Sequence, residues 1–139
     1  MALALDGDDK TWKDRSIWLG HLHNALSGGI VERFHLADKV SRDKNKLRDG
    51  MRIWLTYWRD LMLACSGAQA PLTNLDYTET LQQVAPQIDF STARQCASAL
   101  ENALADIDLN LNPRLLVEVV LMDWPKIKRV DLPTTLPIE

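Results

Sequence analysis

The sequence predicts an all-α protein, a compact bundle of five to six helices with short connections. Along most of the chain apolar residues recur three and four positions apart, which is the spacing of helices with one buried face. No stretch of convincing length alternates apolar and polar residues as a strand would. Helix caps and breakers separate the periodic segments. At 139 residues the chain fits one domain with a core of its own.

The first two helices are separated by Gly28-Gly29. The first should begin at an acidic cap, Asp8 or Asp9, and run to Leu26. Its inward side chains are expected to be Trp12, Ser16, Leu19, Leu22 or His23, and Leu26. The second should cover residues 30–40. The side chains expected on its apolar side are Ile30, Val31, Phe34, Ala37 and Val40.

The third helix has the strongest pattern, over residues 47–65, and Gly67 should end it. Its apolar stripe consists of Leu47, Met51, Trp54, Leu55, Trp58, Leu61, Met62 and Cys65. Trp54 and Trp58 lie four residues apart on this stripe. Because such stripes usually face inward, we expect both indoles in the core rather than at an interface.

Three further helices are predicted after a loop over residues 68–76. A short one from Tyr77 to about Val84 should end before Pro86. The next should start at a Ser91 cap and point Ala93, Cys96 or Ala97, Leu100, Leu104 and Ile107 inward.

Asn112-Pro113 starts the last helix, since Asn caps free N–H groups and Pro has none to lose. Only Glu118 is charged in the apolar run 115–122, so this helix is either central to the core or shared with a partner. We assign residues 1–125 to the helical domain and residues 126–139 to an extended C-terminal tail, given Pro133 and Pro137.

Composition narrows the classes of function. A net charge of −3 argues against a protein that mainly neutralises phosphates. The locally basic residues 42–52 and 126–129 nevertheless leave a helical nucleic-acid-binding module open as an alternative. Two isolated cysteines, Cys65 and Cys96, fit a reducing compartment, and no apolar run is long enough to span a membrane. We therefore expect a cytoplasmic protein.

The sequence proposes no catalytic, cofactor-binding or metal-binding residue. Gly28-Gly29 is not followed by the Lys-Ser or Lys-Thr of a phosphate loop, so it is interpreted as a turn. His21 and His23 lie two apart and cannot share a helix face, which disfavours joint metal binding. Both cysteines lie on apolar stripes, where a thiol is usually a small core residue. This stretch of protein is expected not to be an enzyme.

A few polar residues are candidates for structural or interface roles. Arg59 and Asp60 could link helices by charge-assisted hydrogen bonds, or form only a partly exposed local pair. Asn112 should cap the last helix. Arg114 opposes the macrodipole at the start of that helix, so we expect it to contact another helix or another subunit.

Three sequence elements occur in an order that points to a known family. They are Arg59-Asp60-Leu61-Met62, Asn74-Leu75-Asp76, and Asn110-Leu111-Asn112-Pro113-Arg114-Leu115 with Glu118. Together they resemble the C-terminal collar domain of the delta-prime subunit of the bacterial DNA polymerase III clamp loader. The resemblance covers about residues 2–124. It adds Asn74 and Asn110 to Arg59, Asp60, Asn112 and Arg114 as candidate structural or interface residues.

The resemblance implies a non-catalytic oligomerisation domain. In that family five collar domains pack in a ring, and the complex loads the sliding clamp for an ATP-dependent DNA polymerase holoenzyme, a transferase. The implied partners are the motor and clamp-opening subunits; DNA would be contacted only indirectly, and no cofactor, small-molecule substrate or membrane is implied. The family's ATPase-like module and zinc cysteines would lie upstream, so we expect a fragment with an added Met1 or a truncated relative. A collar domain of the motor (gamma/tau) subunit remains open.

Overall fold

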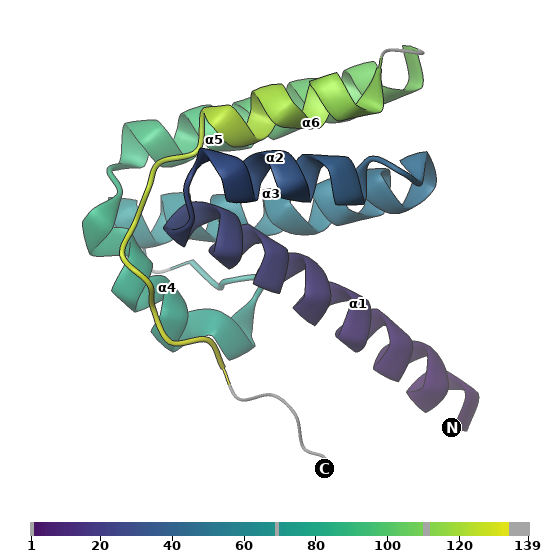
Figure 1. Cartoon of the computed structure of the whole chain (residues 1–139). Helices are drawn as coiled ribbons and strands as arrows, with labels where there is room; N and C mark the ends of the chain where they lie inside the picture. The colour runs from purple at the N-terminus through teal and green to yellow at the C-terminus, as the bar shows by residue number, and fades with distance from the viewer. Residues whose placement is uncertain (1, 69, 110–111, 134–139) are drawn as a thin grey trace.

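The computed structural model describes residues 2–68, 70–109 and 112–133 (Figure 1). The helices are α1 (Ala2–Ser27), α2 (Ile30–Val40), α3 (Lys44–Ser66), α4 (Thr78–Val84), α5 (Phe90–Asp106) and α6 (Pro113–Met122). Three single 3₁₀ turns, Leu75–Tyr77, Ala85–Gln87 and Ile107–Leu109, join or extend them. No strand occurs in these ranges. The prediction of an all-α bundle of five to six helices is confirmed.

The bundle is organised around α3. This helix packs against α5, α1 and α4, while α2 packs against α6 and α1, and α5 packs against α6. Figure 1 shows α6 alongside α2, with α1 crossing beneath and its N-terminal end pointing away from the bundle. Helices α2 and α6 run antiparallel, because Arg33 bonds to carbonyls near the end of α6 and Asp38 pairs with Arg114 at its start.

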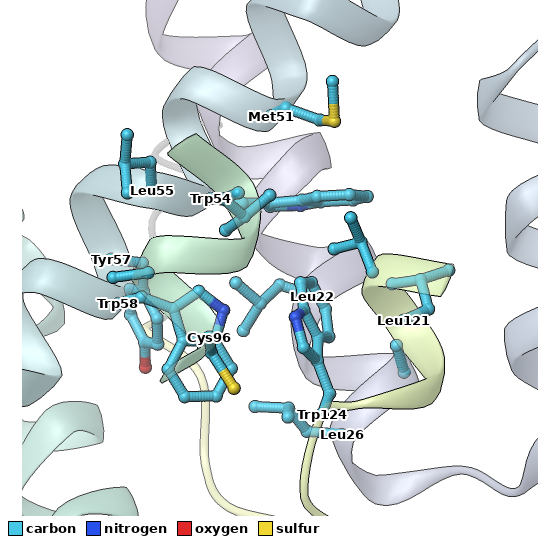
Figure 2. Close-up of a cluster of buried hydrophobic side chains, with 14 of the residues drawn as sticks. Leu22, Leu26, Met51, Trp54, Leu55, Tyr57, Trp58, Cys96, Leu121 and Trp124 are labelled. Atoms are coloured by element: carbon cyan, nitrogen blue, oxygen red, sulfur yellow. The ribbon is translucent and has the colours of Figure 1, made fainter. Parts of the chain in front are cut away.

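Side chains of α3 dominate the core, as its pattern predicts. Trp54 and Trp58 are fully buried, which confirms their assignment to the core. Figure 2 shows them among side chains from α1, α3, α5 and α6. Fully burying one such large apolar side chain contributes about 1.5 to 3 kcal/mol, so each of the two indoles stabilises the bundle by about that amount.

The predicted starts of two helices need correction. α1 begins at Ala2 rather than at Asp8 or Asp9, and α5 begins at Phe90 with Asp89 as its cap rather than Ser91. The Asp89 carboxylate accepts the Thr92 N–H at 2.7 Å. A carboxylate at this position also interacts favourably with the helix dipole, which a serine hydroxyl does not. Asp43 and Asn112 cap α3 and α6, and Gly67 ends α3 with φ at 73°, as predicted for Asn112 and Gly67.

The predicted inner face of α2 is partly wrong. Ala37 and Val40 are buried, but Ile30, Val31 and Phe34 are exposed, and the helix buries Arg33 and Leu36 instead. Apolar spacing alone favours the face with the larger hydrophobic residues. The structure turns α2 the other way because the Arg33 side chain bonds to several carbonyl groups inside the bundle.

After α6 the chain continues in an extended conformation across the end of the bundle. We name residues 125–133 the C-terminal strap (yellow in Figure 1). Ile127 is buried, and its N–H donates to the Leu26 carbonyl at 3.0 Å. The N–H groups of Lys128 and Asp131 donate to side-chain oxygens of Gln87 and Gln83. The strap thus ties α6 to α1 and to the α4 region.

Candidate functional site

A buried arginine fixes where α2, α6 and the strap meet. Arg33 donates from Nε to the carbonyl oxygen of Ala25 at 2.9 Å and from Nη1 to those of Leu121 and Trp124 at 2.9 and 2.6 Å. Its Nη2 donates to the Pro125 carbonyl at 3.0 Å. The guanidinium supplies donors to carbonyls that a helix end leaves free. Arg33 thereby sets the rotation of α2 and the direction of α6.

Charged side chains run across the α2–α6 seam. Asp38 accepts from Arg42 at 2.9 Å and pairs with Arg114 at 3.3 Å, and Arg114 also contacts Glu118 at 3.2 Å. The Arg42 hydrogen bond and charge, followed by the charge of Arg114, lower the pKa of the Asp38 carboxyl. Arg114 therefore makes a contact with another helix of its own chain, one of the two kinds expected from its unfavourable place at a helix N-terminus.

Beside this seam α6 presents an apolar stripe to solvent. Leu115, Val119 and Met122 are 57, 58 and 37% exposed, respectively. Their spacing of four and three residues places them on one side of α6, opposite the buried Val117 and Leu121. A shallow depression lies beside Leu115 and Val119. The helix thus has two apolar sides, one in the core and one open.

The neighbouring helix α2 adds its own exposed apolar side chains. Ile30, Val31 and Phe34 are exposed on α2, the helix that packs along α6. We name the six exposed side chains of the two helices the α2–α6 face: Ile30, Val31, Phe34, Leu115, Val119 and Met122. Exposed apolar groups bordered by charges are typical of protein-interaction surfaces.

Two of the candidate residues, Asp60 and Asn74, lie inside the domain. Asp60 accepts from the N–H groups of Thr73 and Asn74 at 2.8 and 2.7 Å, and from Asn74 Nδ2 at 2.8 Å. Arg15 of α1 donates to Asn74 Oδ1 at 2.9 Å. Because both Asp60 and Asn74 are buried, this network holds the loop after α3 against α3 and α1.

The remaining candidates lie at the surface or outside the described residues. Arg59 pairs with Glu101 at 2.7 Å and joins α3 to α5, with both side chains about half exposed. Asn112 Oδ1 accepts from the N–H groups of Arg114 and Leu115, so its role as a cap is confirmed. Asn110 lies outside the described residues. The sequence analysis did not identify Arg33 as a buried structural residue. The only indication in the sequence is that this charged residue stands among apolar ones in α2.

Burial favours the uncharged forms of His23, Tyr57 and the two cysteines. His23 Nε2 lies 2.7 Å from the Tyr57 hydroxyl, and burial lowers the pKa of His23 to about 4 and raises that of Tyr57. Burial also raises the pKa of Cys65, and that of Cys96 to about 12, so their reactive thiolate forms are disfavoured. Within the described ranges no three His, Cys, Asp or Glu residues are grouped as metal ligands.

Fold and surface together define a helical bundle domain whose last helix is apolar on both sides. Comparison with known proteins gives the family. A family model described as DNA polymerase III, delta subunit, C terminal, matches residues 9–126, and the chain belongs to this family. The family places the chain among the subunit-interaction domains of the DNA polymerase III clamp loader, which are non-catalytic. Neither the curated proteins nor the solved structures contained a match. No helix in the described ranges is long and apolar enough to cross a membrane.

Proposed function

We propose that this chain is a delta-prime-like collar domain that packs through its α2–α6 face against a neighbouring collar domain of the clamp loader. The exposed stripe of Leu115, Val119 and Met122 carries the proposal. Covering these side chains with another apolar surface removes them from water and so favours association. The occupant is another helical domain of the same complex, because the family is one of clamp-loader subunits.

The charges beside the stripe support a specific rather than a non-specific contact. Asp38, Arg42, Arg114 and Glu118 form a mixed-sign row along the seam. Such a row can pair with charges of a partner at the rim of an interface and set its register. A stable interface of ordinary size buries about 1,200 to 2,000 Å² in total, more than one helix stripe offers, so we expect both α2 and α6 to contribute.

The delta-prime assignment rests on the three ordered sequence elements. In this structure a residue of each element has a defined role, since Asp60 and Asn74 hold one loop and Asn112 caps α6. A collar domain of the motor subunit would share the helical fold, so competition between subunits must distinguish the two.

Competition in a reconstituted clamp loader tests the assignment. The full chain is added in excess to the motor, delta and delta-prime subunits, and the assembled complex is separated by size. We expect the chain to displace delta-prime and to leave the amount of delta unchanged. Displacement of the motor subunit would identify a motor-type collar instead, and absence of any co-elution would refute the assembly role.

Substitutions on α6 test the surface. The variant L115D/V119D places two charges in the stripe without touching buried residues, and we expect it to weaken binding to the motor subunit at least tenfold. Leu75→Asp is the control, because Leu75 is also an exposed leucine, 69% exposed, but lies on the Leu75–Tyr77 turn. Equal losses in the two variants, or retained binding by L115D/V119D, would exclude the α2–α6 face.

A further inference from the structure

A second surface, beside the start of α2, carries concentrated positive charge. Where the strap passes the end of α1 and the start of α2, it borders an open hollow. Lys126, Lys128 and Arg129 line this hollow from the strap. Asn24 and Ser27 at the end of α1 and Gln87 after α4 supply neutral polar groups. Three cations within four residues are unusual in a chain whose net charge is −3.

Within the described residues these three cations have no close carboxylate partner, and the charge of Lys126 acts on Glu32 only at longer range. Among the described residues no ion pair joins Lys126, Lys128 or Arg129 to a carboxylate. The basic segment 42–52 differs, since its three arginines, Arg42, Arg48 and Arg52, pair with Asp38, Asp108 and Asp49. Lys44 and Lys46 of that segment also lack an ion pair among the described residues, but in the strap all three cations do, and they lie within four residues.

The carboxylate of Glu32 also borders the hollow, but it is hydrogen-bonded to the backbone at the start of α2. It accepts the Gly29 N–H at 2.6 Å, and this hydrogen bond is the main cause that lowers the pKa of Glu32. The start of α2 is thus already occupied by a carboxylate, so an incoming anion would meet the strap cations instead. With Glu32 counted, the hollow still has an excess of two positive charges.

The lining indicates what kind of anion fits. The residues that line the hollow include no aromatic side chain, and the side chain of Ile127, the apolar residue of this part of the strap, is buried in the bundle. Single-stranded nucleic acid is usually held by bases stacked on aromatic rings, and peptides are usually anchored by apolar side chains in pockets. Cations with neutral donors on an open surface suit the phosphates of a duplex, which are contacted without reading sequence.

We infer that the strap hollow binds the sugar–phosphate backbone of duplex DNA independently of sequence. Lys126, Lys128 and Arg129 supply the charge, and the side-chain amides of Asn24 and Gln87 supply additional hydrogen-bond donors to phosphate oxygens. The extended strap spaces Lys126 and Lys128 about 6.6 Å apart, the distance between alternate residues of an extended chain, and Arg129 follows directly. This contact would be direct, would use residues other than the six of the α2–α6 face, and would give the domain a role besides assembly.

Salt dependence of DNA binding by the full chain is the test. The probe is a short fluorescein-labelled DNA duplex, and its anisotropy is followed at several NaCl concentrations. Each neutralised phosphate contributes a slope of about −0.9 in log K against log salt, so three give about −2.7 and a roughly 40-fold loss between 50 and 200 mM. We expect K126Q/K128Q/R129Q to bind at least tenfold more weakly at low salt, with a slope near zero.

The control removes the same charge from the other basic segment. R42Q/K44Q/K46Q should keep the slope and the affinity of the unchanged chain, and thermal unfolding verifies that both triple variants are folded. Absence of binding at low salt, equal losses in the two variants, or preference for a polyglutamate peptide over the duplex would overturn the inference. Co-elution of the strap variant with the motor subunit should persist, which separates this result from the assembly proposal.

Discussion

Replacing Arg33 should cause the largest loss of stability of any single polar substitution in the domain. The variant Arg33→Met keeps the length and packing of the side chain but removes its donors to Ala25, Leu121, Trp124 and Pro125. Of these carbonyls, that of Leu121 keeps another donor, the Trp124 N–H at 3.2 Å. The carbonyls of Ala25, Trp124 and Pro125 lose the donor that Arg33 supplies.

The size of the effect follows from these contacts. A hydrogen bond to a charged group contributes about 1.5 to 3 kcal/mol net, while burying the cation costs several kcal/mol. The two terms together give an expected loss of about 3 to 5 kcal/mol in the free energy of unfolding. For a urea slope of about 2 kcal/mol per molar, the unfolding midpoint should fall by about 2 M.

Equilibrium urea unfolding measures the loss in the free energy of unfolding, with Arg59→Met as the control. Arg59 makes one ion pair at the surface, with Glu101, so its loss should cost less than about 1 kcal/mol. If Arg33→Met lost no more than Arg59→Met, the argument that Arg33 fixes α2, α6 and the strap would be refuted.

Three further outcomes are expected. Gly50→Ala should destabilise by about 1 to 3 kcal/mol, although alanine favours helix, because a Cβ there would lie 2.2 Å from the Trp18 ring; unchanged urea unfolding would contradict this. Asn112→Ala should cost about 0.5 to 2 kcal/mol by loss of the α6 cap, measured by thermal unfolding with Asn45→Ala, an exposed residue within α3, as the control. The low pKa of His23, about 4 against 6.5 unfolded, means that the unfolded state binds the extra proton as pH falls below 6.5; stability should drop by about 2 kcal/mol from about pH 7.5 to about pH 5, and His23→Gln should lack this part of the pH dependence.

The helices could be predicted from sequence because local rules agree with the fold there. The α3 stripe, the Gly67 end and the Asn112 cap each follow from side-chain chemistry within a few residues. The start of α5 was wrong because Asp89 and Ser91 are both good caps, and sequence spacing does not decide between them.

The candidate surface could be predicted only in part. The apolar character of α6 is plain in the sequence, yet which side faces solvent depends on how α6 packs on α2 and α5. The orientation of α2 was mispredicted because Arg33 interacts with carbonyls about ninety residues away in the sequence. A local pattern cannot predict contacts between such distant segments. The free charge of the strap likewise became visible only when the ion pairs of residues 42–52 were known.

The tryptophans of the core have a practical consequence for optical measurements. Trp18 contacts Trp54 edge to face with ring centroids 5.2 Å apart, and Trp54 and Trp58 both contact Trp124, at 5.1 and 5.6 Å. These four indoles form one continuous chain of rings through α1, α3 and Trp124, the second residue after α6. Near-ultraviolet circular dichroism and intrinsic emission, to which Trp12 also contributes, will therefore be sensitive to a loosening at any of the three segments.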